Sequence, residues 1–375
     1  MSLIQVDAGQ EWRGGQRQSL LLAREIHKKG YPLSFVVQPD SPLHKKASEE
    51  HIPVIPIKLR GEMDLKSALR LAWAMKRKKC ALVHFHDAHS LAVGSYAAAW
   101  AKVPLRFVSR RVDFPLNKNP LSKRKYRKDV DSIIAVSEGV KKVLIEGGIP
   151  SKSIEVVPDG VDFSPFEVKK KSEYLRHELS FAPDDYLVGI VAHLADHKGH
   201  KYLIEATKIL KEKAPKIKVI IVGEGPLMMD LTQQAKDIHV EDMVFFLGFR
   251  EDVPQILASL DLFVLSSYLE GMGSSIMDAM AHRLPVVASR VGGIPEVVKQ
   301  GKTGLLVPAR KPPALAEAIL TFYADRSLAE DYGQKGYEVV RKKFSAESMA
   351  SKIIGIYERK ARSKGVALPV PVREL

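Results

Sequence analysis

Carboxylates and hydroxyls gather in one short stretch of the sequence, where Glu270 and Asp278 enclose Ser274 and Ser275. If a helix starts at the serines, its first N–H groups lack partners within the helix and carry a partial positive charge. Such a helix start, with two hydroxyl groups beside it, could bind a phosphate group. The carboxylates would repel phosphate but could accept hydrogen bonds from sugar hydroxyls. This chemistry suits a phosphorylated sugar, and the alternative is a capped helix with an acidic first turn.

The elements around this stretch must place these groups at one edge of a sheet. The apolar run 262–265 predicts a buried strand, and a turn that contains Gly271, Met272 and Gly273 follows it. The two glycines allow the backbone to approach a ligand closely. A helix, a second strand and a second helix come next. This order predicts a doubly wound sheet, in which ligands bind at the carboxyl ends of the strands.

The stretch 261–308 carries four short motifs, namely Glu270-(x7)-Asp278, Pro285-Val286-Val287-Ala288, Gly292-Gly293-x-x-Glu296 and Gly301-x-x-Gly304. In this order they resemble the donor-binding signature of the family 4 retaining glycosyltransferases, within the glycosyl transferases group 1 superfamily. The resemblance implies an α/β protein with the GT-B fold, in which two Rossmann-like, doubly wound parallel-sheet domains face each other across a cleft. It also implies that Glu270 orients the sugar. Asp278 replaces the usual Glu, which keeps the charge and shortens the reach.

Two further residues correspond to the family pattern Gly-Arg-(x4)-Lys-Gly. Lys198 precedes Gly199 in the segment after the predicted strand 186–191 and matches the family's lysine, whereas His193 stands at the arginine position. The resemblance implies that these groups neutralise a diphosphate as it leaves. His193 would carry charge only if a neighbouring phosphate raised its pKa. A solvated surface lysine is the alternative for Lys198.

The remaining donor-side residues follow two more predicted strands. Gly223, Glu224 and Gly225 come after strand 217–222, and the resemblance implies that they line the nucleotide pocket. Phe249 and Arg250 follow strand 243–247 and correspond to positions beside the base. The resemblance implies no cofactor and no required metal, because the nucleoside-diphosphate sugar is itself a substrate.

The first half of the chain alternates strands and helices, which predicts another parallel sheet. Gly14 and Gly15 follow the predicted strand 3–8 and precede a helix expected from about Gln16. The dinucleotide fingerprint G-x-G-x-x-G is absent. The resemblance implies that the glycine pair lets this loop approach the donor phosphates and the acceptor, and a structural tight turn is the alternative.

Charged and imidazole side chains follow two strands of this half. His84 and His86 lie two residues apart at the end of strand 81–85, and we expect them to point to opposite faces, which disfavours a metal site. The resemblance implies that His86 hydrogen-bonds the transferred sugar or the acceptor. Arg110 and Arg111 follow strand 105–109, where many family members have a histidine, and they suit an anionic acceptor.

Charge is distributed unevenly along the 375 residues. Residues 1–165 contain 28 Lys and Arg against 17 Asp and Glu, a net charge of +11, which leaves only +3 of the total +14 for the rest. Such an excess indicates an anionic partner. The basic segment 117–129 has one aromatic residue, Tyr126, which gives little stacking surface for nucleic acid. We therefore favour docking at an anionic membrane leaflet or a lipid-linked phosphorylated glycan.

The composition and the missing motifs exclude or disfavour several other classes of protein. The single Cys80 excludes a disulfide framework, and no apolar run approaches the ~20 residues that span a bilayer. The first residues lack the layout of a signal peptide, so we expect a cytoplasmic protein that can lie at the inner face of the cytoplasmic membrane. A dehydrogenase is disfavoured, since the dinucleotide fingerprint is missing.

The predicted organisation has an acceptor-binding domain at 1–165 and a donor-binding domain at 166–345. A helix within 346–375 is expected to cross back to the first domain, followed by a loose tail. The resulting hypothesis is retaining transfer of a sugar to a cell-envelope glycan or lipid-linked sugar, such as lipopolysaccharide core. The alternatives are a sugar-nucleotide epimerase of the same fold and a non-catalytic basic protein that binds glycan or nucleic acid. The sequence leaves the sugar, the base, the acceptor and the oligomeric state open.

Overall fold

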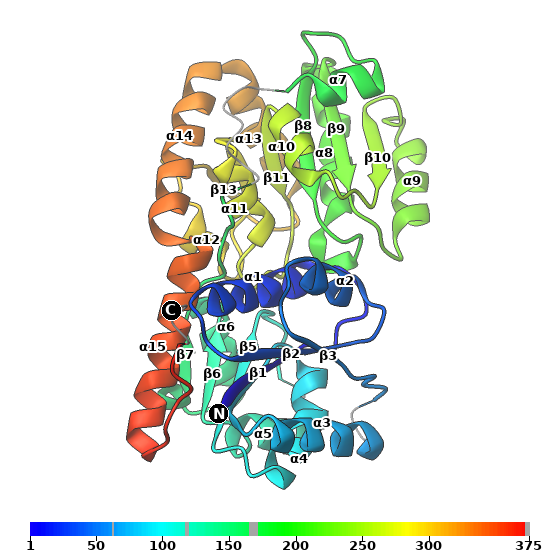
Figure 1. Cartoon of the computed structure of the whole chain (residues 1–375). Helices are drawn as coiled ribbons and strands as arrows, with labels where there is room; N and C mark the ends of the chain where they lie inside the picture. The colour runs from blue at the N-terminus through cyan, green and yellow to red at the C-terminus, as the bar shows by residue number, and fades with distance from the viewer. Residues whose placement is uncertain (62–63, 117–119, 165–171, 372–375) are drawn as a thin grey trace. The chain divides into compact units, whose positions relative to one another are not determined.

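The computed structural model describes residues 1–61, 64–116, 120–164 and 172–371, with the backbone alone for 120–123. The chain forms two compact units, drawn in Figure 1. Unit 1 comprises Met1–Gly160 and Ala346–Leu375, and unit 2 comprises Val161–Ser345. The predicted boundary after residue 165 adjoins the segment 165–171, which lies outside the described residues. In the described part of the chain, no helix is long and apolar enough to cross a membrane.

Unit 1 contains a parallel sheet with strand order β3-β2-β1-β4-β5-β6-β7. Its strands are β1 (Ser2–Val6), β2 (Leu33–Val37), β3 (Val54–Pro56), β4 (Cys80–Phe85), β5 (Leu105–Arg110), β6 (Ser132–Ala135) and β7 (Ile154–Val156). The order reverses between β1 and β4, as in a doubly wound sheet. Right-handed crossovers therefore send the helices before and after this reversal to opposite faces.

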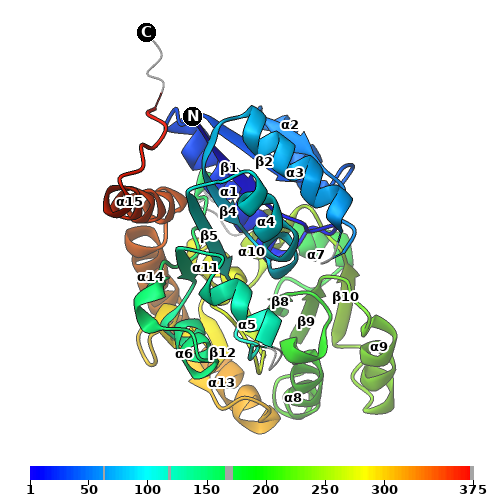
Figure 2. The same ribbon diagram turned by 90° about the horizontal axis from the view of Figure 1, so that it is seen from below.

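Helices cover both faces of this sheet. They are α1 (Gly14–Lys28), α2 (Pro42–Glu49), α3 (Leu65–Arg77), α4 (Ala88–Trp100), α5 (Pro120–Arg127), α6 (Glu138–Glu146) and α15 (Ala346–Lys364). On one face, α1, α2 and α15 bury a core that includes Leu22, Phe35, Phe107 and Tyr357. On the other face, α3, α4 and α5 lie next to one another (Figure 2).

Unit 2 contains a second parallel sheet with strand order β10-β9-β8-β11-β12-β13. Its strands are β8 (Tyr186–Val191), β9 (Ile217–Val222), β10 (Val244–Gly248), β11 (Leu262–Leu265), β12 (Val286–Ser289) and β13 (Leu305–Val307). Most of these strands are apolar on both sides and fully buried, as expected of parallel strands between helix layers.

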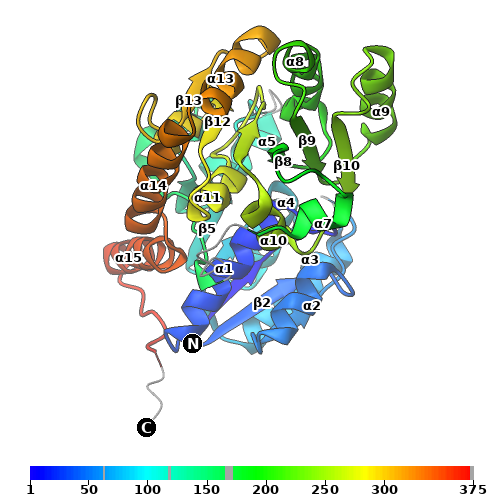
Figure 3. The same ribbon diagram turned by 90° about the horizontal axis from the view of Figure 1, so that it is seen from above.

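Helices flank this sheet on both sides (Figure 3). They are α7 (Tyr174–Leu179), α8 (His200–Lys213), α9 (Met228–Asp237), α10 (Val253–Ser259), α11 (Ser274–Ala281), α12 (Ile294–Val297), α13 (Pro312–Ala324) and α14 (Arg326–Lys343). Helix α13 packs against α8 on one face, and α14 packs against α11 on the other. The predicted α/β class with two doubly wound parallel sheets is confirmed.

Several elements match the sequence prediction closely, and a few were missed. The strands predicted at 186–191, 217–222 and 262–265 have the predicted bounds. Helix α7, at Tyr174–Leu179, was not predicted. Helix α9 was also missed, because only Leu231 and Ala235 are buried on it, so its apolar periodicity is weak.

The packing of α15 on α1 gives a test of the unit 1 core. Ile353 is buried in this core, so Ile353→Ala should lower the free energy of unfolding by about 2–5 kcal/mol. Lys352→Ala, on the exposed face of the same helix, should change it by less than about 0.5 kcal/mol. Urea denaturation followed by circular dichroism measures both, and equal effects of the two substitutions would contradict the packing.

Candidate active site

The carboxyl edge of the unit 2 sheet holds a partly buried ion pair. Lys198 Nζ donates to Glu270 Oε2 at 2.6 Å, and Ser267 Oγ donates to the same oxygen at 3.2 Å. The side chains of Lys198 and Glu270 are 20% and 12% exposed. Because the two residues follow different strands, β8 and β11, the fold brings together groups that are distant in sequence. Both were predicted as site residues.

Backbone packing fixes the two loops that carry this pair. Gly199 has φ +67°, and a Cβ there would overlap the carbonyl oxygen of Ser266. Ser266 Oγ donates to the carbonyl oxygen of Gly199 at 3.0 Å, and the N–H of Tyr268 donates to that of His197 at 2.9 Å. The glycine after Lys198 thus allows the two loops to touch.

Helix α11 begins beside Glu270. Gly273 is its N-cap residue, no side chain caps it, and its first turn contains no acidic residue. The alternative of a capped helix with an acidic first turn is therefore wrong. Ser274 and Ser275 are half-buried in the first turn and leave the capping role unfilled. Met272 and Asp278 are buried, the latter one turn into the helix as predicted.

A second set of contacts joins the same loops and was not predicted. Tyr268 Oη donates to Asp196 Oδ2, and Lys201 Nζ donates to Asp196 Oδ1 at 2.8 Å. The guanidinium of Arg310 lies 3.9 Å from the centre of the Tyr268 ring, a cation–π contact. Asp196, Tyr268 and Arg310 come from three loops at the carboxyl edge of the sheet, and Lys201 lies in the first turn of α8. No local pattern in the sequence links them, since their spacing is set by the fold.

The first residue of α8, His200, was also missed. It is buried, and burial lowers its pKa to about 3, with a further contribution from the nearby charge of Lys198. His200 is therefore neutral at neutral pH. The positive charge at this loop belongs to Lys198.

The segment 223–225 packs against the loop that contains His193. Gly223 has φ +139°, and a Cβ there would overlap the carbonyl oxygen of Ala192. The N–H of Leu194 donates to the carbonyl oxygen of Glu224 at 2.8 Å, while the Glu224 side chain is exposed. Together with Gly225, this segment therefore holds the backbone on both sides of His193, whose side chain is half-buried.

Phe249 and Arg250 follow β10 and have different environments. The Phe249 ring is 46% exposed and offers an aromatic face. Arg250 forms ion pairs with Glu178 and Asp252, each at 2.6 Å, and donates to Tyr174 Oη at 2.9 Å. Arg250 thus joins β10 to α7.

In unit 1, one face of the sheet changes from apolar to polar toward its carboxyl edge. Along β1 the face presents Leu3 and then Gln5, and along β4 it presents Leu82, then His84, with His86 just beyond. The rings of His84 and His86 stack with centroids 4.5 Å apart. The prediction that they point to opposite faces is wrong, because residues two apart on a strand share a face.

Hydrogen bonds occupy both nitrogens of each ring. His84 Nδ1 lies 2.5 Å from Tyr357 Oη, and its Nε2 lies 2.9 Å from Ser109 Oγ. For His86, Arg111 Nη1 donates to Nδ1 at 3.3 Å, so Nε2 carries the proton and donates to Gln5 Oε1 at 2.9 Å. Burial, then the neighbouring charges, lowers the pKa of His84 to about 3 and that of His86 well below 6.5.

Arg111 connects His86 to the last loop of the sheet. Its Nε donates to Asp159 Oδ1 at 3.1 Å, and both side chains are almost completely buried. Arg110 points elsewhere: its Nη2 donates to the carbonyl oxygen of Phe114 at 2.6 Å, and its guanidinium lies over the buried Tyr126 ring. The two predicted acceptor arginines are thus held by different partners.

The first loop of unit 1 is tied to β1 by Asp7, which was not predicted as a site residue. Asp7 accepts hydrogen bonds from the Gly9 N–H at 2.9 Å and from Ser19 Oγ at 2.7 Å. Burial, and then the charge of Asp87, raises its pKa. Gly14 and Gly15 form the first turn of α1, so the helix begins before the predicted Gln16.

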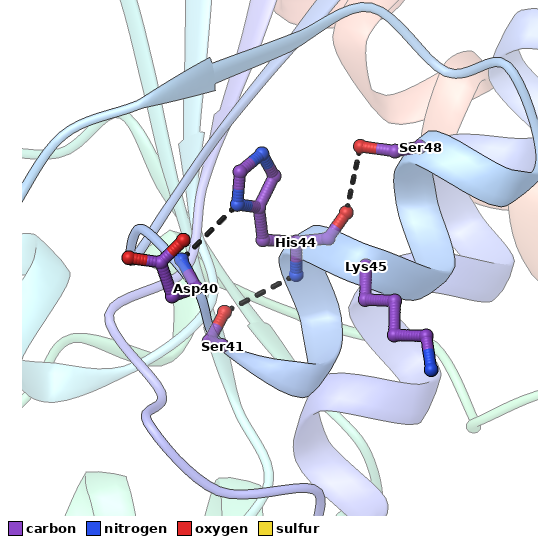
Figure 4. Close-up of a pocket in the computed structure, with 5 residues that line it drawn as sticks. All are labelled: Asp40, Ser41, His44, Lys45 and Ser48. Carbon is purple, nitrogen blue, oxygen red and sulfur yellow. Dashed lines mark hydrogen bonds between the residues drawn. The ribbon is translucent and has the colours of Figure 1, made fainter.

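A shallow pocket lies at the start of α2 (Figure 4). The N–H of His44 donates to Ser41 Oγ, and the N–H of Asp40 donates to His44 Nδ1, each at 3.1 Å. These polar groups bond to one another, as expected of a capped helix start. The pocket contains none of the predicted site residues.

Metal-binding residues do not cluster in the described ranges, where no three His, Cys, Asp or Glu side chains are placed to hold one ion. Of the predicted basic segment 117–129, residues 117–119 lie outside the described residues. Arg124, Arg127 and Lys128 in α5 and just after it are exposed.

Each half of the chain matches a known protein family. Residues 12–164 match the family model described as Glycosyltransferase Family 4, and residues 171–339 match Glycosyl transferases group 1. The chain is a group 1 glycosyltransferase with the GT-B fold.

Relatives of this transferase include N-acetyl-alpha-D-glucosaminyl L-malate synthase of Bacillus anthracis, 28% identical over 302 residues, which cover 78% of each chain. The UDP-Gal:alpha-D-GlcNAc-diphosphoundecaprenol alpha-1,3-galactosyltransferase of Escherichia coli is 26% identical over 332 residues, 84% of this chain and 86% of the relative. Among solved structures, Anabaena HepE in complex with UDP and glucose is 22% identical with a TM-score of 0.86, over 96% of this chain and all of that one.

The contact at Gly199 predicts an effect on the two loops that carry the Lys198–Glu270 pair. Gly199→Ala combines a strained left-handed backbone with a clash against Ser266, so it should lower the free energy of unfolding by at least about 3 kcal/mol. Gly301→Ala is the matched control, because Gly301 has φ +70° but its Cβ would lie 3.9 Å from the nearest atom, so only the backbone strain of about 1–2 kcal/mol is expected. Urea denaturation measures both, and equal losses would contradict a role for the Ser266 contact.

The neutral His84 predicts a pH dependence for unit 1. Its pKa is about 3 in the folded protein, against 6.5 ordinarily. Between these two pH values, His84 is protonated in the unfolded chain but not in the folded chain. Stability is therefore lost as the pH falls from about 6.5 toward 3. His84→Gln should reduce the slope of unfolding free energy against pH by at most ~1.4 kcal/mol per pH unit. Urea denaturation between about pH 7 and 5 measures this slope. The half-buried His27→Gln is the control, and an unchanged slope in His84→Gln would contradict this origin.

Proposed function

We propose that the transferase uses a nucleoside-diphosphate sugar as donor and transfers the sugar with retention of its anomeric configuration. The observation that carries this proposal is the Lys198–Glu270 pair beside the uncapped start of α11. At the carboxyl edge of one sheet, the cationic Lys198 and the helix start would bind a diphosphate, and the adjacent Glu270 carboxylate would bind the sugar.

Different residues would bind the diphosphate, the sugar and the nucleoside of the donor. Lys198 and the first N–H groups of α11 would neutralise the diphosphate, which gains charge as it leaves. Glu270 would accept hydrogen bonds from sugar hydroxyls, and Asp278 from the ribose. His193, half-buried beside the 223–225 segment, would add positive charge once a phosphate raised its pKa. Phe249 offers the base an exposed aromatic face.

In the proposed step, the oxygen of an acceptor hydroxyl bonds to the anomeric carbon while the bond from that carbon to the diphosphate oxygen breaks. The hydroxyl proton passes to an oxygen of the departing diphosphate. Attack on the face from which the diphosphate leaves retains the configuration. Glu270 orients the sugar, because its carboxylate is already held by Lys198 and Ser267. No divalent cation takes part in this proposal.

The acceptor is proposed to be an anion bound by unit 1, and specifically a lipid-linked sugar or other cell-envelope glycan. The net charge of +11 in residues 1–165 supports an anionic acceptor. The name of one relative above contains a diphosphoundecaprenol-linked sugar and that of the other contains L-malate, and both compounds are anions. Arg111, held between His86 and Asp159, is the proposed contact residue.

Donor binding tests the proposal directly. UDP, GDP, ADP and CMP are each titrated into the protein by calorimetry in the presence of EDTA, and one nucleotide should bind clearly. Lys198→Ala should weaken that binding ~10-fold or more, because a charge-assisted bond to phosphate is lost. Lys216→Ala is the control, since Lys216 pairs with Asp184 before β9, away from the carboxyl edge.

The outcomes separate the competing functions. Absence of binding by all four nucleotides would overturn the donor site and leave a basic glycan-binding protein. Product analysis by NMR with the matching nucleotide sugar then separates a transferase, which needs an acceptor, from an epimerase, which does not. L-malate and a diphosphoprenyl-linked sugar serve as alternative acceptors in this assay, and an inverted anomeric configuration would contradict the proposed step.

A further inference from the structure

Helices α3 and α4 of unit 1 expose a continuous set of large apolar side chains. These side chains are between 41% and 62% exposed and comprise Leu65, Leu69 and Trp73 of α3 with Tyr96 and Trp100 of α4. Spacings of four residues place them along one stripe of each helix. The two helices pack against each other, as Figure 2 shows, and the Tyr96 and Trp100 rings lie 6.4 Å apart. We call this set the α3–α4 surface.

The α3–α4 surface is separate from the core of unit 1. Helix α3 buries Ala68, Leu71, Ala72 and Met75 against the protein, so its core-facing stripe is complete without the exposed residues. Large exposed apolar groups that serve no packing role mark a surface that meets another apolar phase. Trp and Tyr are the residues enriched where membrane and water meet.

Positive charge borders the apolar stripe. Residues 65–79 contain no acidic residue and six basic ones, all exposed: Lys66, Arg70, Lys76, Arg77, Lys78 and Lys79. The guanidinium of Arg77 lies 5.2 Å from the centre of the Trp73 ring. The sequence 88–104 contains no acidic residue either.

Helix α5 extends the basic region beside α4. Lys125 Nζ donates to the carbonyl oxygen of Ala88 at 3.3 Å, and Arg124 and Arg127 are exposed. The apolar stripe therefore has cationic residues on α3 itself and on the neighbouring helix α5. This complementarity fits an anionic lipid surface, into which apolar side chains insert while lysines and arginines reach the headgroups.

We propose that the α3–α4 surface docks the protein on an anionic lipid leaflet. An apolar face bordered by Lys and Arg, with Trp among its apolar residues, is the composition of helices that lie in the membrane interface. The partner is lipid rather than nucleic acid, because the exposed set includes leucines along with aromatic rings.

This surface explains how a lipid-linked acceptor could reach unit 1, and in that respect it rests on the proposed function. Helix α4 begins directly after His86 and Asp87, beside Arg111, and ends at Trp100. Its 13 residues span about 20 Å. A leaflet along α3 and α4 would thus lie within one helix length of the proposed acceptor contact.

Vesicle co-sedimentation of the full chain tests the proposal. The protein should sediment with phosphatidylcholine vesicles that contain about one-third phosphatidylglycerol, and less with phosphatidylcholine alone. About 0.5 M NaCl should weaken this binding by screening. The double substitution Leu69→Gln/Trp73→Gln should lower it about 10-fold. Met229→Gln is the matched control, because Met229 is an exposed apolar residue of α9 in unit 2.

Tryptophan emission provides an independent readout. The chain contains three tryptophans, of which Trp73 and Trp100 lie on the α3–α4 surface and Trp12 packs against the unit 1 core. Anionic vesicles should shift the emission to shorter wavelength, and Trp73→Phe with Trp100→Phe should remove most of the shift. Nucleoside-diphosphate binding by the same variants should be unchanged, so failure of lipid docking is distinguishable from failure of the donor site.

Two results would overturn the proposal. One is the absence of binding to anionic vesicles by the folded protein, or binding that the Leu69→Gln/Trp73→Gln change does not reduce. The other is a stable dimer in sedimentation velocity that this substitution dissociates, which would assign the α3–α4 surface to a second copy of the chain.

Discussion

Unit 2 of this transferase depends on one ion pair at the carboxyl edge of its sheet, in which both charges are mostly buried. Lys198 and Glu270 are 72 residues apart and follow different strands, yet their atoms meet at 2.6 Å. Removing a charge from water is costly unless a partner compensates it. The pair therefore requires both loops to hold their positions. Two contacts hold the loops in place: the backbone contact of Gly199 with Ser266, and the side-chain hydrogen bond between Tyr268 and Asp196.

Unit 1 places neutral side chains at the corresponding edge of its own sheet. Toward the carboxyl edge of its sheet, apolar residues give way to Gln5, His84 and Ser109. His84 bonds to Ser109 on one side and to Tyr357 on the other, while Gln5 bonds to His86. Burial keeps His84 and His86 uncharged, so Arg111 and Asp159 carry the charge at this edge. The two units thus share a sheet architecture but place different chemistry at its carboxyl edge.

The sequence predicted the fold and the loops that carry Lys198 and Glu270 well, because both depend on local signals. Apolar runs bounded by glycine gave the strands of unit 2, and Lys198 and Glu270 follow two of those strands. It missed α9, whose buried stripe is two residues wide, and it assigned His84 and His86 to the wrong faces. Tyr268, Asp196 and Arg310 were also missed, since their contacts are long-range and have no local spacing. The domain boundary and the site roles remain predictions.

The return of the chain to unit 1 has a consequence for its gene. Tyr357, which closes the His84 hydrogen-bond chain, belongs to α15, so unit 1 is not encoded by one uninterrupted stretch. Gly160 and Ala346 are neighbours: a Cβ at Gly160 would lie 2.6 Å from the Cα of Ala346. Unit 2 is therefore inserted between two adjacent points of unit 1. Excision of Val161–Ser345 and direct joining of the flanking codons would preserve the path of the remaining polypeptide, whereas simple truncation would delete part of its core.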